Sequence, residues 1–256
     1  IYIGTYGSGV YYSTDNGGLW VQTIQGIVEG RINTLGVTTD NYVFAATDRA
    51  LYRSSDNGTS WLAIAFEGVP VYSLVIDTAN RIFVSAQNTV QVSTDNGVTW
   101  VASGNGLPGS NTLYSLTAAT NGNMYVRTSG SVFRSTDSGG NWTAINSGIT
   151  QSLNTVQSIS VHSTNPNNVL IAVWDGGTSN ATDGVYRTTN GGTNWEVQTP
   201  QVDNLRGVYF SKQNKNKGII VGQINQNGAI LTTTDGGTIW NILTIGTKIL
   251  RSVFLT

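Results

Sequence analysis

Short runs of apolar and β-branched residues alternate along the whole chain with turns rich in Gly, Asn, Asp and Ser. No stretch keeps apolar residues at i, i+3 and i+4 over three helical turns. The pattern therefore predicts many short strands joined by tight turns. One stretch divides into four strands: A over Ile32–Thr38, B over Tyr42–Thr47, C over Ala50–Ser54 and D beginning at Trp61. We expect an all-β fold.

One phrase recurs six times, and its spacing predicts the architecture. Its first copy runs from Ser13 to Trp20, and the acidic or amide position of each later copy follows 39 to 53 residues after the one before. A repeat of about 40–50 residues with strand-like flanks is typical of a β-propeller. The acidic or amide positions are Asp15, Asp56, Asp95, Asp137, Asn190 and Asp235, and the closing tryptophans are Trp20, Trp61, Trp100, Trp142, Trp195 and Trp240.

Each residue type in the phrase has a local physical explanation. The Asp carboxylate can accept hydrogen bonds from the backbone N–H groups of its own turn. The Gly takes a backbone conformation that is closed to other residues, and the Trp opens strand D and packs over the hairpin. We expect these residues to be structural. They are not expected to be catalysts or calcium ligands, because the turn lacks the alternating carboxylates of a calcium loop.

The two ends of the chain complement each other. Only a B strand (Ile1–Thr5) and a C strand (Val10–Ser13) precede the first phrase. The missing A strand is expected over Ile249–Leu255, where it would pair into the first blade and remove open sheet edges. Residues 1–256 thus predict a single domain, a six-bladed β-propeller with four antiparallel strands per blade, whose C-terminal strand completes the N-terminal blade.

The phrase matches S/T-x-D-x-G-x-x-W, and over its whole length the chain resembles the Asp-box (BNR) propeller group. That group includes sialidases, xyloglucanase-type glycosidases, sortilin-like receptors and photosystem assembly factors. The resemblance implies that the boxes lie on the rim, away from the ligand face. Asn165-Pro-Asn-Asn, followed by Gly184 to Gly192, looks most like the xyloglucanase and photosystem-factor branch.

The second position of each A strand varies, while the positions around it stay apolar, small and apolar. Ligands of propellers usually meet the face built from the D-to-A and B-to-C connections, and a binding site must break the repeat symmetry. The variable positions are Asn33, Tyr72, Tyr114, Gln157, Arg206 and Arg251. Arg206 and Arg251 fall on neighbouring blades and could bind a carboxylate, sulfate or phosphate. Alternatively, this column holds water, or the arginines pair with local acids such as Asp203.

Two further features are candidate binding elements. Arg127 takes the place of a small residue at an aligned strand-B position, so it needs either a channel or a buried partner. Trp174 stands on a Gly-rich loop as a stacking platform for a sugar ring, with Asp175 and Asp183 as hydroxyl acceptors. The alternative for this loop is that it folds back and buries Trp174 against the rim.

A sialidase-like activity is the main enzymatic alternative. Gly30 to Leu35 resembles the opening phrase of sialidases, and Asp48 lies in the next B-to-C loop, where an acid catalyst would be sought. The blade order of the tyrosines differs from that family, and the three glutamates (Glu29, Glu67, Glu196) are not expected on A or B strands. A xyloglucanase-like hydrolase needs two carboxylates across a cleft, which one small propeller does not supply. No catalytic residue is therefore assigned.

Composition narrows the choice of partners. The net charge is −1 and the cations are scattered, which argues against nucleic-acid binding. No apolar run reaches the roughly 18 residues that membrane insertion requires. The chain has no Cys, and His162 is its only histidine, so we expect neither a metal site nor a cofactor.

The function expected from these features is that of a monomeric, non-catalytic extracellular module. It would bind a glycan, including an acidic one, or a protein. Absent cysteine and a first residue other than Met fit a processed bacterial protein that is secreted, periplasmic or at the cell surface. The alternatives are a weak or degenerate sialidase-like hydrolase and a scaffold domain of a larger secreted protein.

Overall fold

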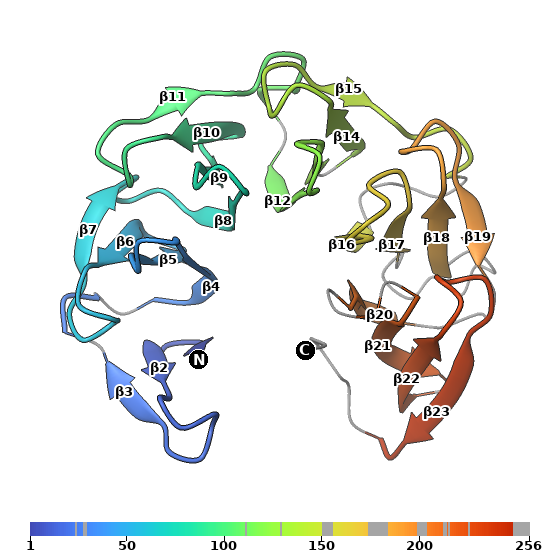
Figure 1. Cartoon of the computed structure of the whole chain (residues 1–256), viewed down its shortest axis with the longest axis horizontal. Helices are drawn as coiled ribbons and strands as arrows, with labels where there is room; N and C mark the ends of the chain where they lie inside the picture. The colour runs from blue at the N-terminus through green and yellow to red at the C-terminus, as the bar shows by residue number, and fades with distance from the viewer. Residues whose placement is uncertain are drawn as a thin grey trace. The chain divides into compact units, whose positions relative to one another are not determined.

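The computed structural model describes residues 1–23, 25–27, 30–110, 112–128, 130–149, 156–173, 184–198, 204–211, 214, 216–224 and 226–247. In this part of the chain every regular element is a β-strand. The strands form six antiparallel sheets, so the protein is the six-bladed β-propeller that its sequence predicts (Figure 1). Within each sheet, neighbouring strands follow chain order.

The chain divides into two compact units, Ile1–Leu116 and Thr117–Thr256. The first unit holds three blades, and its boundary falls within the first strand of the fourth. Its strands are β1 (Tyr2–Gly4), β2 (Val10–Tyr12), β3 (Val21–Thr23), β4 (Ile32–Val37), β5 (Val43–Thr47), β6 (Leu51–Ser54), β7 (Leu62–Ala65), β8 (Val71–Ile76), β9 (Ile82–Ala86), β10 (Thr89–Ser93) and β11 (Val101–Ala102). The A strands β4 and β8 lie side by side, and the D strands β7 and β11 form the opposite edges of the same blades (Figure 1).

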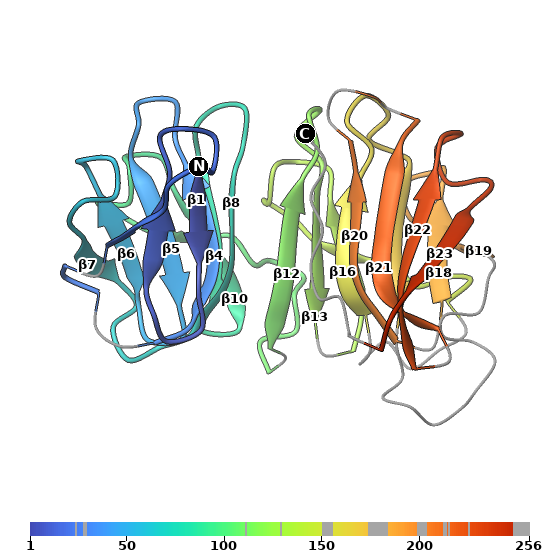
Figure 2. The ribbon, with the colours of Figure 1, turned by 90° about the horizontal axis from the view of Figure 1, so that it is seen from below.

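The second unit holds the remaining blades, whose strands also run side by side (Figure 2). Their strands are β12 (Leu113–Ala118), β13 (Met124–Thr128), β14 (Val132–Ser135), β15 (Thr143–Ala144), β16 (Val156–Val161), β17 (Val169–Val173), β18 (Gly184–Thr188), β19 (Glu196–Gln198), β20 (Asn204–Phe210), β21 (Gly218–Ile224), β22 (Asn227–Thr233) and β23 (Asn241–Ile245).

The sequence placed the strands of the second blade to within one residue, and strand D begins one residue later than predicted. In all six blades strand D begins one residue after the box tryptophan, not at it. Two tryptophans show the reason, because their backbone N–H groups do not bond to strand C and bond to another segment. Trp61 donates to Gln25 O (2.9 Å), and Trp195 donates to Ser147 O (2.9 Å). Both acceptors lie in the connection that leaves the preceding blade.

The first blade has three described strands, β1 to β3, as expected if its A strand comes from elsewhere in the chain. The segment predicted to supply it, Ile249–Leu255, lies outside the described residues. Closure by this segment and a single domain over residues 1–256 therefore remain predictions.

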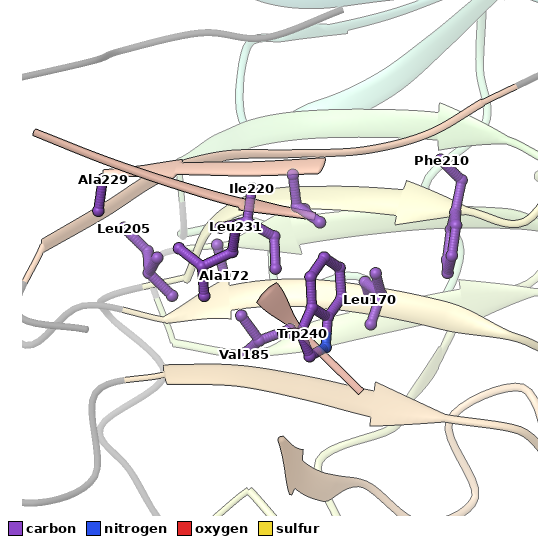
Figure 3. Close-up of a cluster of buried hydrophobic side chains, with 10 residues drawn as sticks. Leu170, Ala172, Val185, Leu205, Phe210, Ile220, Ala229, Leu231 and Trp240 are labelled. Atoms are coloured by element: carbon purple, nitrogen blue, oxygen red, sulfur yellow. The ribbon is translucent and has the colours of Figure 1, made fainter. Parts of the chain in front are cut away.

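The hydrophobic core of each unit lies between successive blades. In the first unit, Phe44 and Leu51 of the second blade pack with Val71, Leu74 and Ile82 of the third. In the second unit, one cluster joins the fifth and sixth blades (Figure 3) and contains Leu170, Ala172, Val185, Leu205, Val208, Phe210, Ile220, Ala229, Leu231 and Trp240. Blade-on-blade burial of this kind supplies the main apolar stabilisation of a repeat protein.

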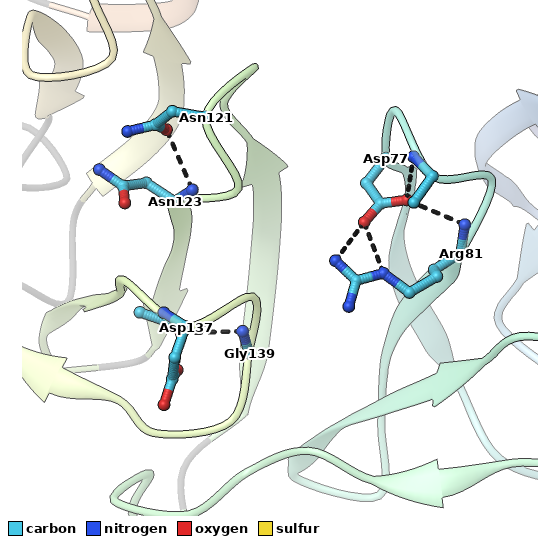
Figure 4. Close-up of polar contacts among 8 residues, drawn as sticks. Asp77, Arg81, Asn121, Asn123, Asp137 and Gly139 are labelled. Carbon is cyan, nitrogen blue, oxygen red and sulfur yellow. Dashed lines mark hydrogen bonds and ion pairs between the residues drawn. The ribbon is translucent and has the colours of Figure 1, made fainter.

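The boxes form one hydrogen-bonded turn that is repeated six times. In the fourth blade the N–H of Gly139, two residues after Asp137, donates to Ser135 Oγ (2.8 Å) (Figure 4). Ser135 Oγ in turn donates to Asp137 Oδ1 (2.7 Å), and Asn141 N–H donates to the same Oδ1 atom (2.8 Å). The fifth blade keeps the same geometry with an amide, since Thr188 Oγ1 donates to Asn190 Oδ1 (2.7 Å). Hydrogen bonds of this type, led by the Thr99 hydroxyl, lower the pKa of Asp95 to about 2.

The A-to-B turns at the same end of the blades are closed in a related way. In the third blade the Arg81 guanidinium pairs with Asp77 Oδ2 (2.6 Å), and the Asp77 Oδ1 atom accepts from Arg81 N–H (2.9 Å) (Figure 4). In the fourth blade Asn123 N–H donates to Asn121 Oδ1 (3.0 Å). Turns and boxes at this end of the blades are thus held by local side-chain hydrogen bonds.

Candidate functional site

In four blades the variable position of the A strand coincides with a β-bulge. The pairing of strands A and B shifts between Ile32 and Thr34, between Val71 and Ser73, between Val156 and Ser158, and between Leu205 and Gly207. The extra residues are therefore Asn33, Tyr72, Gln157 and Arg206. A bulge leaves its extra residue outside the ladder and redirects the side chain, and bulges are common beside binding sites.

Two of the variable residues meet in the first unit. The rings of Tyr72 on β8 and Tyr114 on β12 lie with their centroids 5.6 Å apart and their planes inclined at 57°. Each side chain is 38% exposed. Beside them, Asn33 Nδ2 donates to the carbonyl oxygen of Val71 (2.9 Å), the residue before Tyr72. Asn33, Tyr72 and Tyr114 therefore form one surface, called here the A-strand face.

The strands under the two tyrosines are tied together. Ser73 follows Tyr72, and its hydroxyl accepts a hydrogen bond from Leu116 N–H on β12 (3.0 Å). Ser73 belongs to the small position that is uniform among the A strands. Its role here is a link between blades, and it fixes the spacing of the two aromatic rings.

A further aromatic residue, Tyr6, and two charged residues, Arg31 and Asp48, lie on the B-to-C and D-to-A connections of the first unit. The Arg31 guanidinium stands over the exposed ring of Tyr6, 5.9 Å from its centroid. Arg31 also donates its backbone N–H to Asp48 Oδ1 (3.0 Å), so this carboxylate fastens a turn. Sequence analysis did not single out Tyr6.

The described glutamates do not lie where a sialidase-like mechanism would need them. Glu67 lies in the turn after β7, and Glu196 begins β19, an outermost D strand. Glu29 lies outside the described residues. Neither of these two glutamates therefore lies on a described A or B strand, where it could act together with Asp48.

The second unit carries the cationic candidates. Arg206 and Gln157 stand half-buried at the bulges of β20 and β16, and Arg127 lies on β13 with only 8% of its surface exposed. Arg251, Trp174 and Asp175, with Asp183, lie outside the described residues, so their roles stay predictions.

His162 has a structural place in the second unit. Its ring is buried and lies 5.1 Å from that of Phe210, and its Nδ1 atom accepts from the backbone N–H groups of Thr164 and Asn165 (3.3 and 3.1 Å). Among the described residues no three His, Cys, Asp or Glu side chains gather as metal ligands would. The same part of the chain contains no helix long and apolar enough to cross a membrane.

Two family models match parts of the chain. The model described as sortilin, neurotensin receptor 3, matches residues 88–204, and that of the DUF6242 beta propeller domain matches residues 1–113. Each covers less than half of the chain. No curated protein matches with significant similarity.

Solved structures share the fold at low identity. An ancestral GH74 enzyme has a TM-score of 0.75 at 19% identity, covering 96% of this chain and 36% of its own. The GH74 xyloglucanase from Xanthomonas campestris has a TM-score of 0.75 at 16% identity, covering 94% and 43%. YCF48 bound to a D1 peptide has a TM-score of 0.56 at 16% identity, covering 86% and 82%. The chain thus spans under half the length of the two glycosidases and most of the length of YCF48.

Proposed function

We propose that this chain, an Asp-box (BNR) β-propeller, is a non-catalytic module that binds a glycan on the A-strand face of its first unit. The observation that carries the proposal is the half-exposed pair of Tyr72 and Tyr114 at the position where the repeat symmetry breaks. The proposal includes a monomeric protein that is secreted, periplasmic or on the cell surface of a bacterium.

The physical support is the chemistry of the tyrosine pair. Aromatic rings combine a large apolar surface with a polar handle, here the phenol hydroxyl, and exposed tyrosines are typical of binding surfaces. A pyranose ring offers an apolar C–H face and a rim of hydroxyls, which suits a ring surface flanked by the Asn33 amide. Because the β-bulge and the Ser73 bond hold the strands beneath, the surface is preorganised and little ordering entropy is lost on binding.

In one version of this proposal the ligand is an acidic glycan that binds cationic side chains of the second unit. A guanidinium at a bulge, as at Arg206, can bind a carboxylate with two parallel hydrogen bonds. Arg127 and Gln157 lie on neighbouring strands of the same unit, and Arg251, Trp174 and Asp175 are the predicted additions. In this version Arg206 contributes charge recognition within the second unit.

Peptide binding is the second candidate function. YCF48, solved with a D1 peptide, shares the fold over most of its length. Paired exposed tyrosines also suit a peptide, because they bury a large area at a small cost in side-chain entropy. A sialidase-like hydrolase with Asp48 as its acid, and a scaffold domain of a larger secreted protein, remain alternatives with less support from the geometry.

A glycan array read beside a peptide array tests the proposal. The wild-type protein is compared with Tyr72→Ala/Tyr114→Ala, with Tyr72→Phe/Tyr114→Phe, and with Tyr6→Ala as an exposed-tyrosine control. We expect at least one glycan signal that the alanine pair abolishes and that the phenylalanine pair and the control keep. Signals only on the peptide array would favour the second candidate, and glycan signals of which none depends on the two tyrosines would refute the A-strand face as the site.

A further inference from the structure

In three of the six blades the residue just before the box joins neighbouring blades at the rim. In three blades it is an arginine whose Nη1 atom donates to the next box turn: Arg53 to Asn96 O (2.7 Å), Arg134 to Gly191 O (3.2 Å) and Arg187 to Thr238 Oγ1 (3.0 Å). Each long side chain therefore fills the space between two boxes. These contacts lie within one unit or the other.

The junction of the first and second blades lacks this arginine. The position is Tyr12, and the carbonyl of Asn57, which corresponds to that of Asn96, accepts instead from the hydroxyl of Tyr2 (3.1 Å). The rings of Tyr2 and Tyr12 lie 6.5 Å apart at an angle of 36°. In the described structure the Tyr12 ring makes no bridge to the next box, so the space that arginine fills in those three blades is open here.

Two cavities open on this junction and share Tyr12 as a wall. One, of about 380 Å³, is lined by residues that include Tyr2, Tyr12, Asn16 and Asn57. The other, of about 270 Å³, is lined by Tyr12, Val21, Gln22, Thr23, Gln25 and Thr59. The larger lies within the range of roughly 300–1,000 Å³ that is usual for small-ligand sites.

The walls of these cavities have one consistent chemistry. None of the side chains that line them carries a charge, and most end in an amide or a hydroxyl. The larger cavity is also lined by Ile1, whose ammonium group donates to Ser13 O (2.9 Å). In the part of the chain that the structure describes, the side-chain amides of Asn16 and Asn57 bond no other protein group. The corresponding Asn96 is engaged, donating through Nδ2 to Asp40 Oδ2 (2.7 Å). The junction therefore pairs aromatic faces with uncharged donors and acceptors.

We infer that this junction, called here the rim groove, is a binding site for a neutral oligosaccharide, separate from the A-strand face. One sugar ring occupies each cavity, and Tyr12 lies between the two rings. The amides of Asn16, Asn57 and Gln25 face the sugar hydroxyls, which both donate and accept hydrogen bonds. Neither an acidic sugar nor a charged peptide finds an opposite charge on these side chains.

A single substitution tests the groove without removing the fold. Tyr12→Arg installs the residue that the second, fourth and fifth blades already use, so we expect it to fill the groove and to leave the melting temperature unchanged or higher. Tyr12→Phe keeps the ring, and Tyr72→Ala/Tyr114→Ala leaves the groove intact. The probes are cellotetraose, xylotetraose, mannotetraose and maltotetraose, with tetragalacturonate and an uncharged Ser/Gly/Thr octapeptide for comparison, followed by intrinsic fluorescence and saturation-transfer NMR.

We expect at least one neutral tetrasaccharide to bind the wild type, and Tyr12→Arg to weaken it about tenfold or more, the scale of a lost aromatic contact in a binding site. The Tyr12→Phe and Tyr72→Ala/Tyr114→Ala variants should retain binding. The inference is overturned if no neutral tetrasaccharide binds, or if binding survives Tyr12→Arg. It is also overturned if Tyr12-dependent binding is confined to the octapeptide or to tetragalacturonate. A loss only in Tyr72→Ala/Tyr114→Ala would support the A-strand face and refute the rim groove.

Discussion

The backbone N–H of Leu116 donates to the hydroxyl of Ser73 over 3.0 Å, and this bond joins the A strands of the third and fourth blades. A small polar residue therefore does in the A strand what Arg53 does at the rim, since each links one blade to the next. A similar bond occurs in the second unit, where Phe210 N–H donates to Ser160 Oγ (3.0 Å). Blade contacts are thus polar as well as apolar.

Ser73→Ala removes this acceptor and leaves the Leu116 N–H buried without its partner. We expect a loss of about 1–3 kcal/mol in the free energy of unfolding, the usual cost of an unsatisfied buried donor. The matched control is Ser115→Ala, at the same position of the next A strand, where the serine side chain makes no hydrogen bond in the described structure. Urea unfolding should show the difference, and equal losses for the two variants would contradict the linking role.

The box aspartates predict a specific sensitivity to acid. Hydrogen bonds from Ser60, Thr99 and Ser135 are the leading reasons why the pKa values of Asp56, Asp95 and Asp137 fall to about 2. Because the unfolded pKa is about 3.9, their contribution to stability is complete above pH 4 and is lost as the pH falls towards 2. The melting temperature should therefore decline across that interval.

Asp95→Asn should make this decline shallower while leaving the fold intact at pH 7, because Asn190 already keeps the turn geometry with an amide. Glu67→Gln, which changes an exposed carboxylate that makes no hydrogen bond in the described structure, is the control and should not alter the slope. Calorimetry between pH 7 and pH 2 gives the comparison. Identical slopes for Asp95→Asn and the wild type would show that the box carboxylate is not responsible.

The box tryptophans should differ in how much they stabilise the protein. Trp195 is almost fully buried and its indole N–H donates to Ile145 O (2.7 Å), whereas Trp20 is only half-buried. Trp195→Ala should cost about 3–5 kcal/mol, the range for large aromatic truncations in a core, and Trp20→Ala should cost clearly less. Equal shifts in the denaturant midpoint would argue against packing as the main role of the box tryptophan.

The fold was predictable because the six boxes share one sequence pattern, and each copy of that pattern forms the same hydrogen-bonded turn. Ser135, Asp137 and Gly139 form a turn that needs no distant residue, so the local pattern was sufficient. The start of strand D was not predictable from that pattern. The start depends on which carbonyl accepts the backbone N–H of Trp61, and that acceptor, Gln25 O, lies in the connection that leaves the first blade.

The sequence predicted which positions of the A strands form the candidate site, but it did not predict how their side chains are arranged. Alignment of the A strands placed Tyr72 and Tyr114 at equivalent positions, yet the bulge at Tyr72 and the contact between the two rings depend on strand pairing and blade packing. A sequence signal for the bulge exists: the apolar residues Val71 and Leu74 stand three positions apart, which breaks the alternation of a regular strand. The rim groove had a signal too, since arginine recurs directly before three boxes while the first box has Tyr12.

The central claim is that Tyr72 and Tyr114 act together as one glycan-binding surface. The most direct measurement is a calorimetric titration of the strongest array glycan into the wild type, Tyr72→Ala, Tyr114→Ala and the double variant, with Tyr6→Ala alongside. Each single variant should weaken binding about tenfold or more, and the double variant should lose little beyond either single loss, because the rings act as a unit. Unchanged affinity in both single variants would contradict the account.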